Sequence, residues 1–285
     1  MTRIMRLYYY GISGAIGGLI AWQISNMIGL SFVSSIYLSE VVVGAIIGLC
    51  VGVSIGMVEG ILRKSVTYTM RSILVFAGLG AAGGAVGLPL AEGLFQISGG
   101  ELWSRLVGWS LFGLLVGIAA GAKSGAQIWK GGLGGLLGGF FGGVLLSAIQ
   151  GLFSNQLIGK ALGLIVLGAS VGVFIALIVF LLSRAWIEVK SGKLKGMEFI
   201  LDKFMRQNSP SAFIGSDALK AEIVLPDPDI DPQHAMLKGF ETHFTIKDMS
   251  LSGTYLNNKR VETARLQDRQ MIKLGNTEMM YYEKR

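Results

Sequence analysis

Six apolar segments of about 20 residues follow one another in the first part of the chain, and their length limits what the chain can fold into. A helix needs about 20 apolar residues to cross the hydrocarbon core of a bilayer. Segments of this length predict membrane-spanning helices rather than buried helices of a water-soluble protein. The segments are 8–30, 41–62, 72–95, 106–122, 131–153 and 161–182.

Basic residues are distributed unevenly over the flanks of these segments. One set of flanks has only Arg105 and Lys160, whereas the other carries Arg3, Arg6, Arg63, Lys64, Arg71, Lys123, Lys130 and Arg184. Lys and Arg are concentrated on the cytoplasmic side of membrane proteins, so we expect both termini in the cytoplasm. The first segment ends without a small-x-small cleavage site, which favours a retained span over a signal peptide.

The composition changes near residue 185 and predicts a domain boundary there. The mean hydropathy of +0.58 and the charged fraction of 15% are typical of a membrane protein, because a soluble domain has about 25% charged residues. Residues 1–184 hold ten of the 25 Lys and Arg and four of the 18 Asp and Glu, and 36 of the 42 glycines. We expect a six-span glycine-rich transmembrane domain at 1–184 and a cytoplasmic domain at 185–285.

Glycines recur in the apolar segments with a spacing that predicts close helix packing. The first segment of each successive pair carries a similar motif: Ser13-Gly14-Ala-Ile-Gly17-Gly18, Gly80-Ala-Ala-Gly83-Gly84 and Gly134-Gly135-Leu-Leu-Gly138-Gly139. The second segments carry glycines four residues apart, as in the series Gly44, Gly48, Gly52, Gly56 and Gly60. Residues four apart share a helix face, where glycine lets another backbone approach. We expect three repeated helical hairpins, and the same faces suit homo-oligomer contacts.

The sequence gives little support for a transport function or for enzymatic or metal chemistry. An ionisable group at the centre of a membrane helix costs about 2.5 to 3.5 kcal/mol of insertion free energy and is kept only where function requires it. In this chain the charged residues lie near the span ends: Glu59, Glu92, Arg105 and Lys160. Cys50 is the only cysteine, and His234 and His243 are the only histidines, so no zinc site is expected. No Walker-type motif occurs. We therefore expect no catalytic residues, metal, cofactor or nucleic-acid partner, and no enzymatic activity.

Beyond residue 184 the long apolar runs give way to short strand-like ones. Residues 185–190 and 197–202 flank a glycine-containing loop and predict a hairpin. Later strand-like runs are 222–225, 235–238, 241–247, 270–274 and 278–282. Many short strands with turn residues between them predict an all-β sandwich of two sheets.

The order of residues from Ala212 to Asn258 is more specific than hydropathy requires. It runs Phe213-Ile-Gly215-Ser216, then Asp231-Pro-Gln-His234, then Asp248-Met-Ser250-Leu-Ser252-Gly253-Thr254-Tyr-Leu-Asn257. This order resembles the forkhead-associated (FHA) domain, whose pattern is Gly-Arg, an apolar strand, Ser-x-x-His and Asp-x-Ser-x-Asn-Gly-Thr-x-x-Asn-Gly. The matching positions are Gly215, His234, Asp248, Ser250, Gly253, Thr254 and Asn257. The resemblance covers about residues 186–282 and implies a β-sandwich.

The resemblance also implies a recognition site for phosphothreonine, but the contacts to the ligand are replaced. In the family, the Arg and the Ser of these motifs contact the phosphate, and the Asn before Gly-Thr holds the peptide backbone. Here the corresponding residues are Ser216, Asp231 and Ser252. The scaffold positions His234, Gly253 and Thr254 are kept.

We therefore expect a degenerate FHA domain within a membrane-anchored scaffold of a signalling or assembly system. The domain is expected to bind a protein partner at its recognition loops, at Gly215, Ser216, Asp231, His234, Ser252, Gly253, Thr254 and Asn257. Two alternatives remain open. In one, Lys220 or Lys238 supplies the missing charge and phosphothreonine is still read. In the other, the membrane half is a channel or transporter that the FHA domain regulates. We expect a multi-pass integral membrane protein of a bacterial inner (cytoplasmic) membrane.

Overall fold

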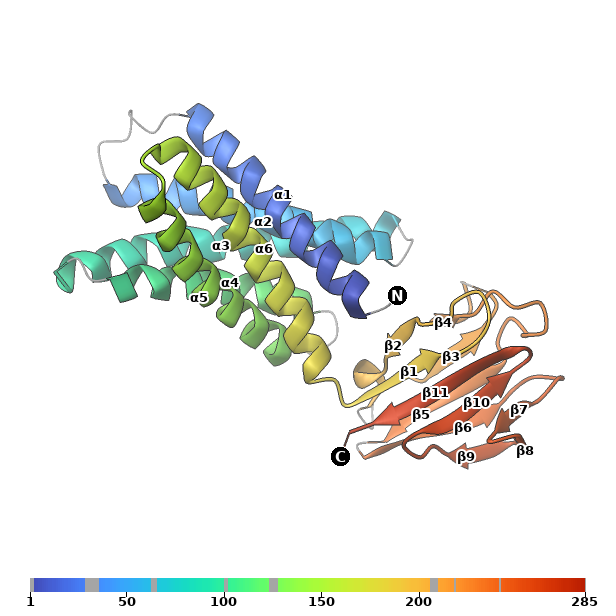
Figure 1. Ribbon diagram of the computed structural model, residues 1–285. Helices are drawn as coiled ribbons and strands as arrows, with labels where there is room; N and C mark the ends of the chain where they lie inside the picture. Colours follow the sequence, from blue (N-terminus) through green and yellow to red (C-terminus); the bar gives the residue numbers. More distant parts are fainter. Residues whose placement is uncertain are drawn as a thin grey trace. The chain divides into compact units, whose positions relative to one another are not determined.

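The computed structural model describes residues 3–28, 36–62, 66–99, 102–122, 128–205, 210–217, 219–240 and 242–284. The chain divides into two compact units, one from Ile4 to Leu182 and one that begins at Ser183. The first unit consists of helices and the second of strands, as Figure 1 shows. The basic flank residues Arg63, Lys64 and Lys123 lie outside the described residues.

The six predicted helices are present. They are α1 (Arg3–Ile28), α2 (Ile36–Leu62), α3 (Val66–Ile97), α4 (Leu102–Ala122), α5 (Ile128–Leu152) and α6 (Gln156–Leu181). Within the described part of the chain, five stretches are long and apolar enough to cross a membrane: Tyr37–Val58, Thr69–Ile97, Trp103–Gly121, Ile128–Leu152 and Gln156–Leu181. Pro89 lies inside α3.

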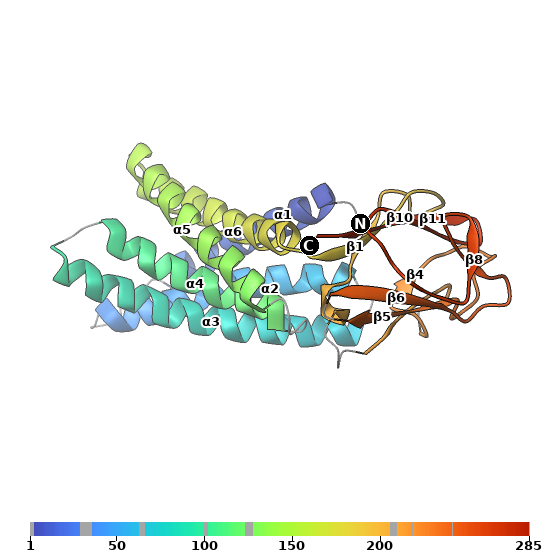
Figure 2. The ribbon, with the colours of Figure 1, turned by 90° about the horizontal axis from the view of Figure 1, so that it is seen from below.

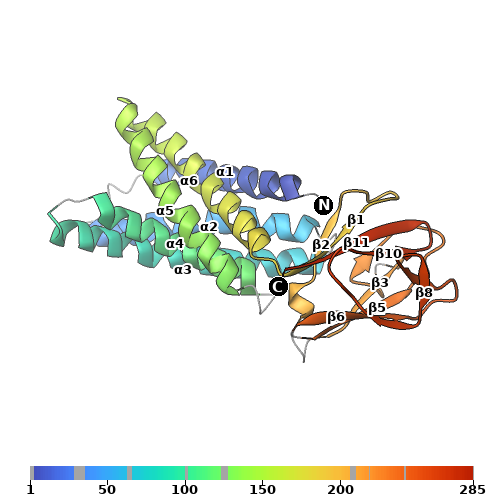
Figure 3. The ribbon, with the colours of Figure 1, turned by 60° about the horizontal axis from the view of Figure 1, so that its bottom comes forward.

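The remaining helix, α1, lies alongside α6 (Figures 1 and 3). A side chain at Gly14 would collide with the backbone of Gly168, and one at Gly18 would collide with the carbonyl of Leu164. The carbonyl of Tyr10 lies equally close to Gly172. As residue numbers rise in α1 they fall in α6, so the two helices are antiparallel over these turns. This contact places α1 beside the most hydrophobic of the five candidate spans.

The same antiparallel seam occurs twice more in the bundle. In α2 and α3, Gly44 faces Gly84 and Gly48 faces Gly80. In α4 and α5, Gly113 faces Gly135 and Gly117 faces Gly131. The tightest contacts therefore join neighbouring hairpins of the repeat, namely α6 with α1, α2 with α3 and α4 with α5. Figure 2 shows the bundle from a second direction.

The doubled glycines of the repeat serve two neighbours at once. Gly18 faces α6, whereas Gly17 lies against Val51 and Cys50 of α2. In the same way, Gly84 faces α2 and Gly83 faces α4. Gly135 faces α4 and Gly134 faces α6. Successive residues of a helix point about 100° apart. An adjacent pair of glycines thus lets one helix approach two others closely.

The centre of the helical unit is apolar. Its fully buried apolar residues include Val51, Ile55, Phe112, Val116, Leu167, Val171 and Ile175 of α2, α4 and α6, and Tyr10, Ala21 and Phe76 of α1 and α3. Several polar side chains of the helices donate to backbone carbonyls. The Ser13 hydroxyl donates to the carbonyl of Ser54 at 2.6 Å, and the Ser110 hydroxyl donates to the carbonyl of Leu106 at 2.7 Å. Lys130, 4% exposed, donates to the carbonyl of Leu182 at the end of α6 at 2.6 Å.

The second unit is a sandwich of two sheets, which appear as two layers in Figure 2. The six-stranded sheet has the order β2-β1-β11-β10-β7-β8 and the five-stranded sheet the order β4-β3-β5-β6-β9. The strands are β1 (Ala185–Val189), β2 (Glu198–Ile200), β3 (Ala212–Gly215), β4 (Ile223–Val224), β5 (Ala235–Phe240), β6 (His243–Asp248), β7 (Thr254–Leu256), β8 (Lys259–Val261), β9 (Thr263–Arg265), β10 (Gln270–Leu274) and β11 (Thr277–Glu283). The predicted hairpin of β1 and β2 is present, and β3 with β4 is a parallel pair.

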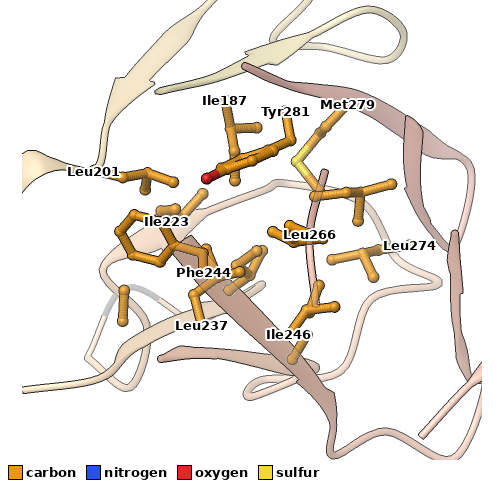
Figure 4. Packing of buried hydrophobic residues seen from close by; sticks show 14 of the residues in the cluster. Ile187, Leu201, Ile223, Leu237, Phe244, Ile246, Leu266, Leu274, Met279 and Tyr281 are labelled. Atoms are coloured by element: carbon orange, nitrogen blue, oxygen red, sulfur yellow. The ribbon is translucent and has the colours of Figure 1, made fainter. Parts of the chain in front are cut away.

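Alternate residues of these strands form the core between the sheets (Figure 4). Ile187, Met279 and Tyr281 come from the six-stranded sheet, and Leu237 and Phe244 from the other. The rings of Phe244 and Tyr281 meet edge to face with centroids 6.2 Å apart. The start of β1 is held by the buried Asp202, whose Oδ1 accepts the N–H groups of Arg184 and Ala185 at 2.9 and 3.0 Å. The unit therefore has a core of its own.

A leucine at Gly48 should destabilise the helical unit, because its side chain collides with the carbonyl of Gly80. Overpacking of this kind costs about 1 to 3 kcal/mol or more. Gly78→Leu is the matched control, since nothing lies within 4 Å of a Cβ built at Gly78. We expect Gly48→Leu to lower the unfolding temperature in detergent and Gly78→Leu to leave it unchanged. Equal stability of the two variants would show that the seam does not hold the bundle.

Candidate functional site at the recognition loops

Three loops of the sandwich meet around Asp231, which lies between β4 and β5. The carbonyl of Asp231 accepts the N–H of Ser216 at 3.0 Å, and its carboxylate Oδ2 accepts the N–H of Leu251 at 3.0 Å. The Gln233 side chain donates to the carbonyl of Lys220 at 3.0 Å. Residues from the β3–β4, β4–β5 and β6–β7 loops thus form one surface, which we call the recognition end.

His234 is buried behind this surface and holds two of the loops together. Its Nδ1 accepts the N–H of Asp231 at 3.2 Å, and its Nε2 lies 3.2 Å from the carbonyl of Gly253. A ring that accepts at Nδ1 and faces a carbonyl at Nε2 is neutral, with its proton on Nε2. His234 is 0% exposed, so its role here is to position the loops.

The two matching glycines are required by space and by backbone conformation. A side chain at Gly215 would collide with the carbonyl of Pro232. Gly253 has a φ of +90°, which L side chains rarely adopt. A side chain at Gly253 would also contact the guanidinium of Arg260, an exposed residue of β8.

Asp248 organises the β6–β7 loop through one carboxylate oxygen. Its Oδ1 accepts the hydroxyls of Ser250 and Thr254 at 2.7 and 2.9 Å, and the Ser250 hydroxyl oxygen accepts the N–H of Gly253 at 2.8 Å. Burial by itself raises the pKa of the Asp248 carboxyl, but the hydrogen bonds from Ser250 and Thr254 outweigh burial and hold the pKa below its ordinary value.

Asn257 belongs to a turn and to the sheet beside it. Asn257 and Asn258 have φ values of +47° and +66°, the left-handed pair of a two-residue hairpin turn between β7 and β8. The Asn257 Oδ1 accepts the N–H of Met271 at 3.0 Å, and its own N–H donates to the Met271 carbonyl at 3.0 Å. These bonds join the turn to β10, although the side chain remains exposed.

The three replaced positions lie at the recognition end with no cationic side chain among them. Ser216 is half-buried, and the exposed Ser252 donates its hydroxyl to the carbonyl of Asp229 at 3.4 Å. Asp231 brings a carboxylate to the place where the loops meet. In this part of the molecule, Ser216, Asp231 and Ser252 therefore offer hydroxyls and a negative charge in place of a guanidinium.

The two lysines considered as substitutes lie in different places. Lys220 is exposed on the β3–β4 loop, whereas Lys238 lies on β5 with its ammonium over the ring of Phe240, 5.7 Å from the centroid. Arg260, which the sequence reasoning did not single out, lies against Gly253. In the sequence, Arg260 is marked only by its position three residues after Asn257. That position becomes informative only when the β7–β8 hairpin is known.

No metal site is found in the described ranges, where no group of three or more His, Cys, Asp or Glu side chains is arranged to hold an ion. The second histidine, His243, stacks on Phe240 with ring centroids 5.0 Å apart.

The comparison with protein families gives a match at these loops. Residues 212–275 match the FHA domain model. The chain contains an FHA domain.

Several solved structures, among them FHA domains, resemble 36% of the chain. The FHA domain of the CT664 protein from Chlamydia trachomatis is 25% identical, over 36% of this chain and 100% of that chain, with a TM-score of 0.32. The cytoplasmic domain of the T3SS sorting platform protein PscD from P. aeruginosa is 20% identical, over 36% of this chain and 82% of that chain, with a TM-score of 0.31. A chain from a structural and functional analysis of phosphothreonine-dependent FHA domain interactions is 24% identical, over 36% and 98%, with a TM-score of 0.31. The search of curated proteins gave no match.

Replacing Asp248 by Ala should destabilise the FHA domain by about 1 to 3 kcal/mol near neutral pH, because two hydroxyls lose their acceptor. The pKa of Asp248 is lowered by folding, so its stabilisation is present above the unfolded-state pKa of about 3.9 and is lost as pH falls through the lower folded pKa. We expect wild type and variant to converge at acid pH.

The measurement is urea unfolding at several pH values, followed by the fluorescence of Trp186 in a chain whose other four tryptophans are Phe. The control is Asp268→Asn, which keeps an acceptor for the N–H of Glu283. A constant difference between wild type and Asp248→Ala from neutral to acid pH would contradict the assigned network.

Proposed function

We propose that the chain is a membrane-anchored interaction protein whose FHA domain binds a protein partner at the recognition end without depending on phosphothreonine. The observation that carries this proposal is the division of roles at the loops. His234, Asp248 and Gly215 hold the loop backbones in place, whereas Ser216, Asp231 and Ser252 replace the residues that would contact a phosphopeptide. A shaped surface is kept and its ligand chemistry is changed.

The negative charge of Asp231 supports this reading. A phosphothreonine carries about −1.5 to −2 charges and would approach the Asp231 carboxylate, which repels it. A guanidinium binds phosphate with two parallel hydrogen bonds, and the Ser216 hydroxyl cannot replace them. A phosphothreonine reader with relocated cations is the second candidate, and it is favoured by the positions of Lys220 and Arg260 beside these loops.

For the helical unit we propose an anchoring and scaffolding role with domains at 1–184 and 185–285. The fully buried apolar residues of α2, α4 and α6 fill the centre of the bundle, which supports packing over a hydrated path through it. A place in a bacterial cytoplasmic membrane is part of this proposal. Homo-oligomer contacts through the glycine faces are not, because Gly14, Gly48 and Gly113 pack against helices of the same chain.

The chain should bind phosphothreonine peptides at least a hundredfold more weakly than a micromolar complex, which is worth about 8.2 kcal/mol. The absent charge-assisted bond contributes about 1.5 to 3 kcal/mol, and the carboxylate adds repulsion. The measurement is fluorescence polarisation of a phosphothreonine library with the full chain in detergent. Conversely, the triple change Ser216→Arg, Asp231→Ser and Ser252→Asn should create phosphate-dependent binding.

Specific low-micromolar binding by the wild type that phosphatase abolishes would overturn the phosphate-independent proposal. Arg260→Ala and Lys220→Ala then decide the second candidate, because loss of that binding in either variant assigns the phosphate contact to the changed residue. Lys238→Ala is the matched control, since Lys238 lies over Phe240 on β5.

Both termini should be cytoplasmic. The basis is the excess of basic residues on one set of flanks, and the residues at several fusion points lie outside the described ranges. Reporters fused after Arg63, Lys123 and Arg285 should show cytoplasmic activity, and those after Ser34, Ser98 and Ser154 external activity. An external reporter at the C-terminus would contradict the proposal, because the FHA domain would then face away from cytoplasmic partners.

A further inference from the structure

The most exposed large apolar side chains of the FHA domain gather at the recognition end. Within the described residues after Ser183, Leu219 and Leu251 are each 95% exposed and Met249 is 48% exposed. Leu219 belongs to the β3–β4 loop, and Met249 and Leu251 to the β6–β7 loop. We call these three side chains the leucine surface. Their clustering on the loops of one site differs from the scattered apolar residues of an ordinary surface.

The backbone N–H groups of both leucines are hydrogen-bonded within their loops. The N–H of Leu219 donates to Oδ1 of Asp217 at 2.9 Å, and the N–H groups of Lys220 and Ala221 donate to the Asp217 carbonyl at 3.1 and 3.0 Å. The N–H of Leu251 donates to Oδ2 of Asp231 at 3.0 Å. Hydrogen bonds that hold a loop backbone before binding reduce the ordering entropy that is lost when a partner covers the side chains.

Each leucine therefore has a carboxylate at hydrogen-bond distance from its own amide. One oxygen of each carboxylate is used in that bond, Oδ1 in Asp217 and Oδ2 in Asp231. A carboxylate oxygen accepts more than one hydrogen bond, so both groups retain acceptor capacity for a partner's donors. The cations nearby are Lys220, next to Leu219, and Arg260, against Gly253.

We propose that the leucine surface anchors an unphosphorylated protein segment that presents apolar side chains together with Lys or Arg. The apolar groups of the segment cover Leu219, Met249 and Leu251, and its cations pair with Asp217 and Asp231. This inference rests on the proposed function and specifies the partner chemistry of the same site. The same carboxylates disfavour docking on the anionic leaflet of a membrane, which attracts basic rather than acidic surfaces.

The test begins with a displayed library of random, unphosphorylated twelve-residue peptides, selected on the full chain in nanodiscs. We expect enriched peptides to combine Leu, Ile, Met or Phe with Lys or Arg. The most enriched peptide, made with a fluorescent label, then serves as the probe in polarisation titrations. A selection that enriches acidic peptides, or that enriches none, overturns the inference.

Two pairs of substitutions separate the apolar and the charged contributions. Leu219→Ser with Leu251→Ser should weaken binding of the labelled peptide roughly tenfold or more, as the loss of central apolar anchors does. Asp217→Asn with Asp231→Asn keeps an acceptor oxygen for each leucine amide and removes both charges, and it should weaken binding about two- to tenfold. Asp268→Asn is the matched control, because Asp268 also accepts a backbone N–H but at the end of β11.

Phosphorylation of the selected peptide should change its affinity in opposite directions for a phosphate-independent domain and for a phosphothreonine-binding domain. A phosphothreonine in the peptide should weaken binding here, and stronger binding would overturn the inference. Unchanged affinity of the Leu219→Ser, Leu251→Ser chain would also overturn it. In that case peptide binding that is lost in Gly215→Leu, whose side chain collides with Pro232, still supports the proposed function. Peptide binding that survives in Gly215→Leu as well contradicts both.

Discussion

Backbone contact between helices is the interaction on which the helical unit depends. Between membrane helices the hydrophobic effect contributes little, because lipid is as apolar as the side chains, and packing supplies the attraction. At Gly14, Gly48 and Gly113 the partner's backbone lies where a Cβ would be. Three equivalent seams follow from this one constraint, and doubled glycines such as Gly17 and Gly18 allow each odd-numbered helix to make two of these approaches.

The FHA domain depends on a different constraint, which is that every loop amide at the recognition end needs an acceptor. His234, Ser250, Asp231 and Asp217 supply acceptors from side chains. In a site built for phosphate, oxygen atoms of the ligand are available as acceptors for such donors. Here carboxylates of the chain itself accept the N–H groups of Leu219 and Leu251, so these two amides have acceptors that do not come from a ligand.

Much of this was predictable from the sequence because the signals were local. Long apolar runs predicted the helices, and the motif around His234 and Asp248 predicted the FHA domain, which the family match confirms. Four short strands were missed, β3, β7, β8 and β9, which have three or four residues each, too few for alternation to register. The partner of each glycine face was also beyond the sequence, since Gly14 and Gly168 stand 154 positions apart and only the closed bundle joins them.

Arg260 and the leucine surface were missed for a related reason. A single Leu in a loop is unremarkable in a sequence, and Leu219 and Leu251 acquire meaning because separate loops bring them to one end of the domain. Asp231 was recognised as a charge that opposes phosphate. Its second role, as the acceptor that fixes Leu251, needed the coordinates.

At the recognition end, the hydrogen bonds of His234 and Asp248 do not depend on the three replaced side chains, and this explains how the chemistry can change while the fold is kept. The side-chain bonds of His234 and Asp248 end on loop backbone or on Ser250 and Thr254. These bonds use no side-chain atom of Ser216, Asp231 or Ser252. Substitution at those three positions therefore leaves the bonds of His234 and Asp248 in place. It removes the bonds that the Asp231 carboxylate makes to Leu251 and the Ser252 hydroxyl makes to Asp229, and it changes the charge and polarity offered to a partner.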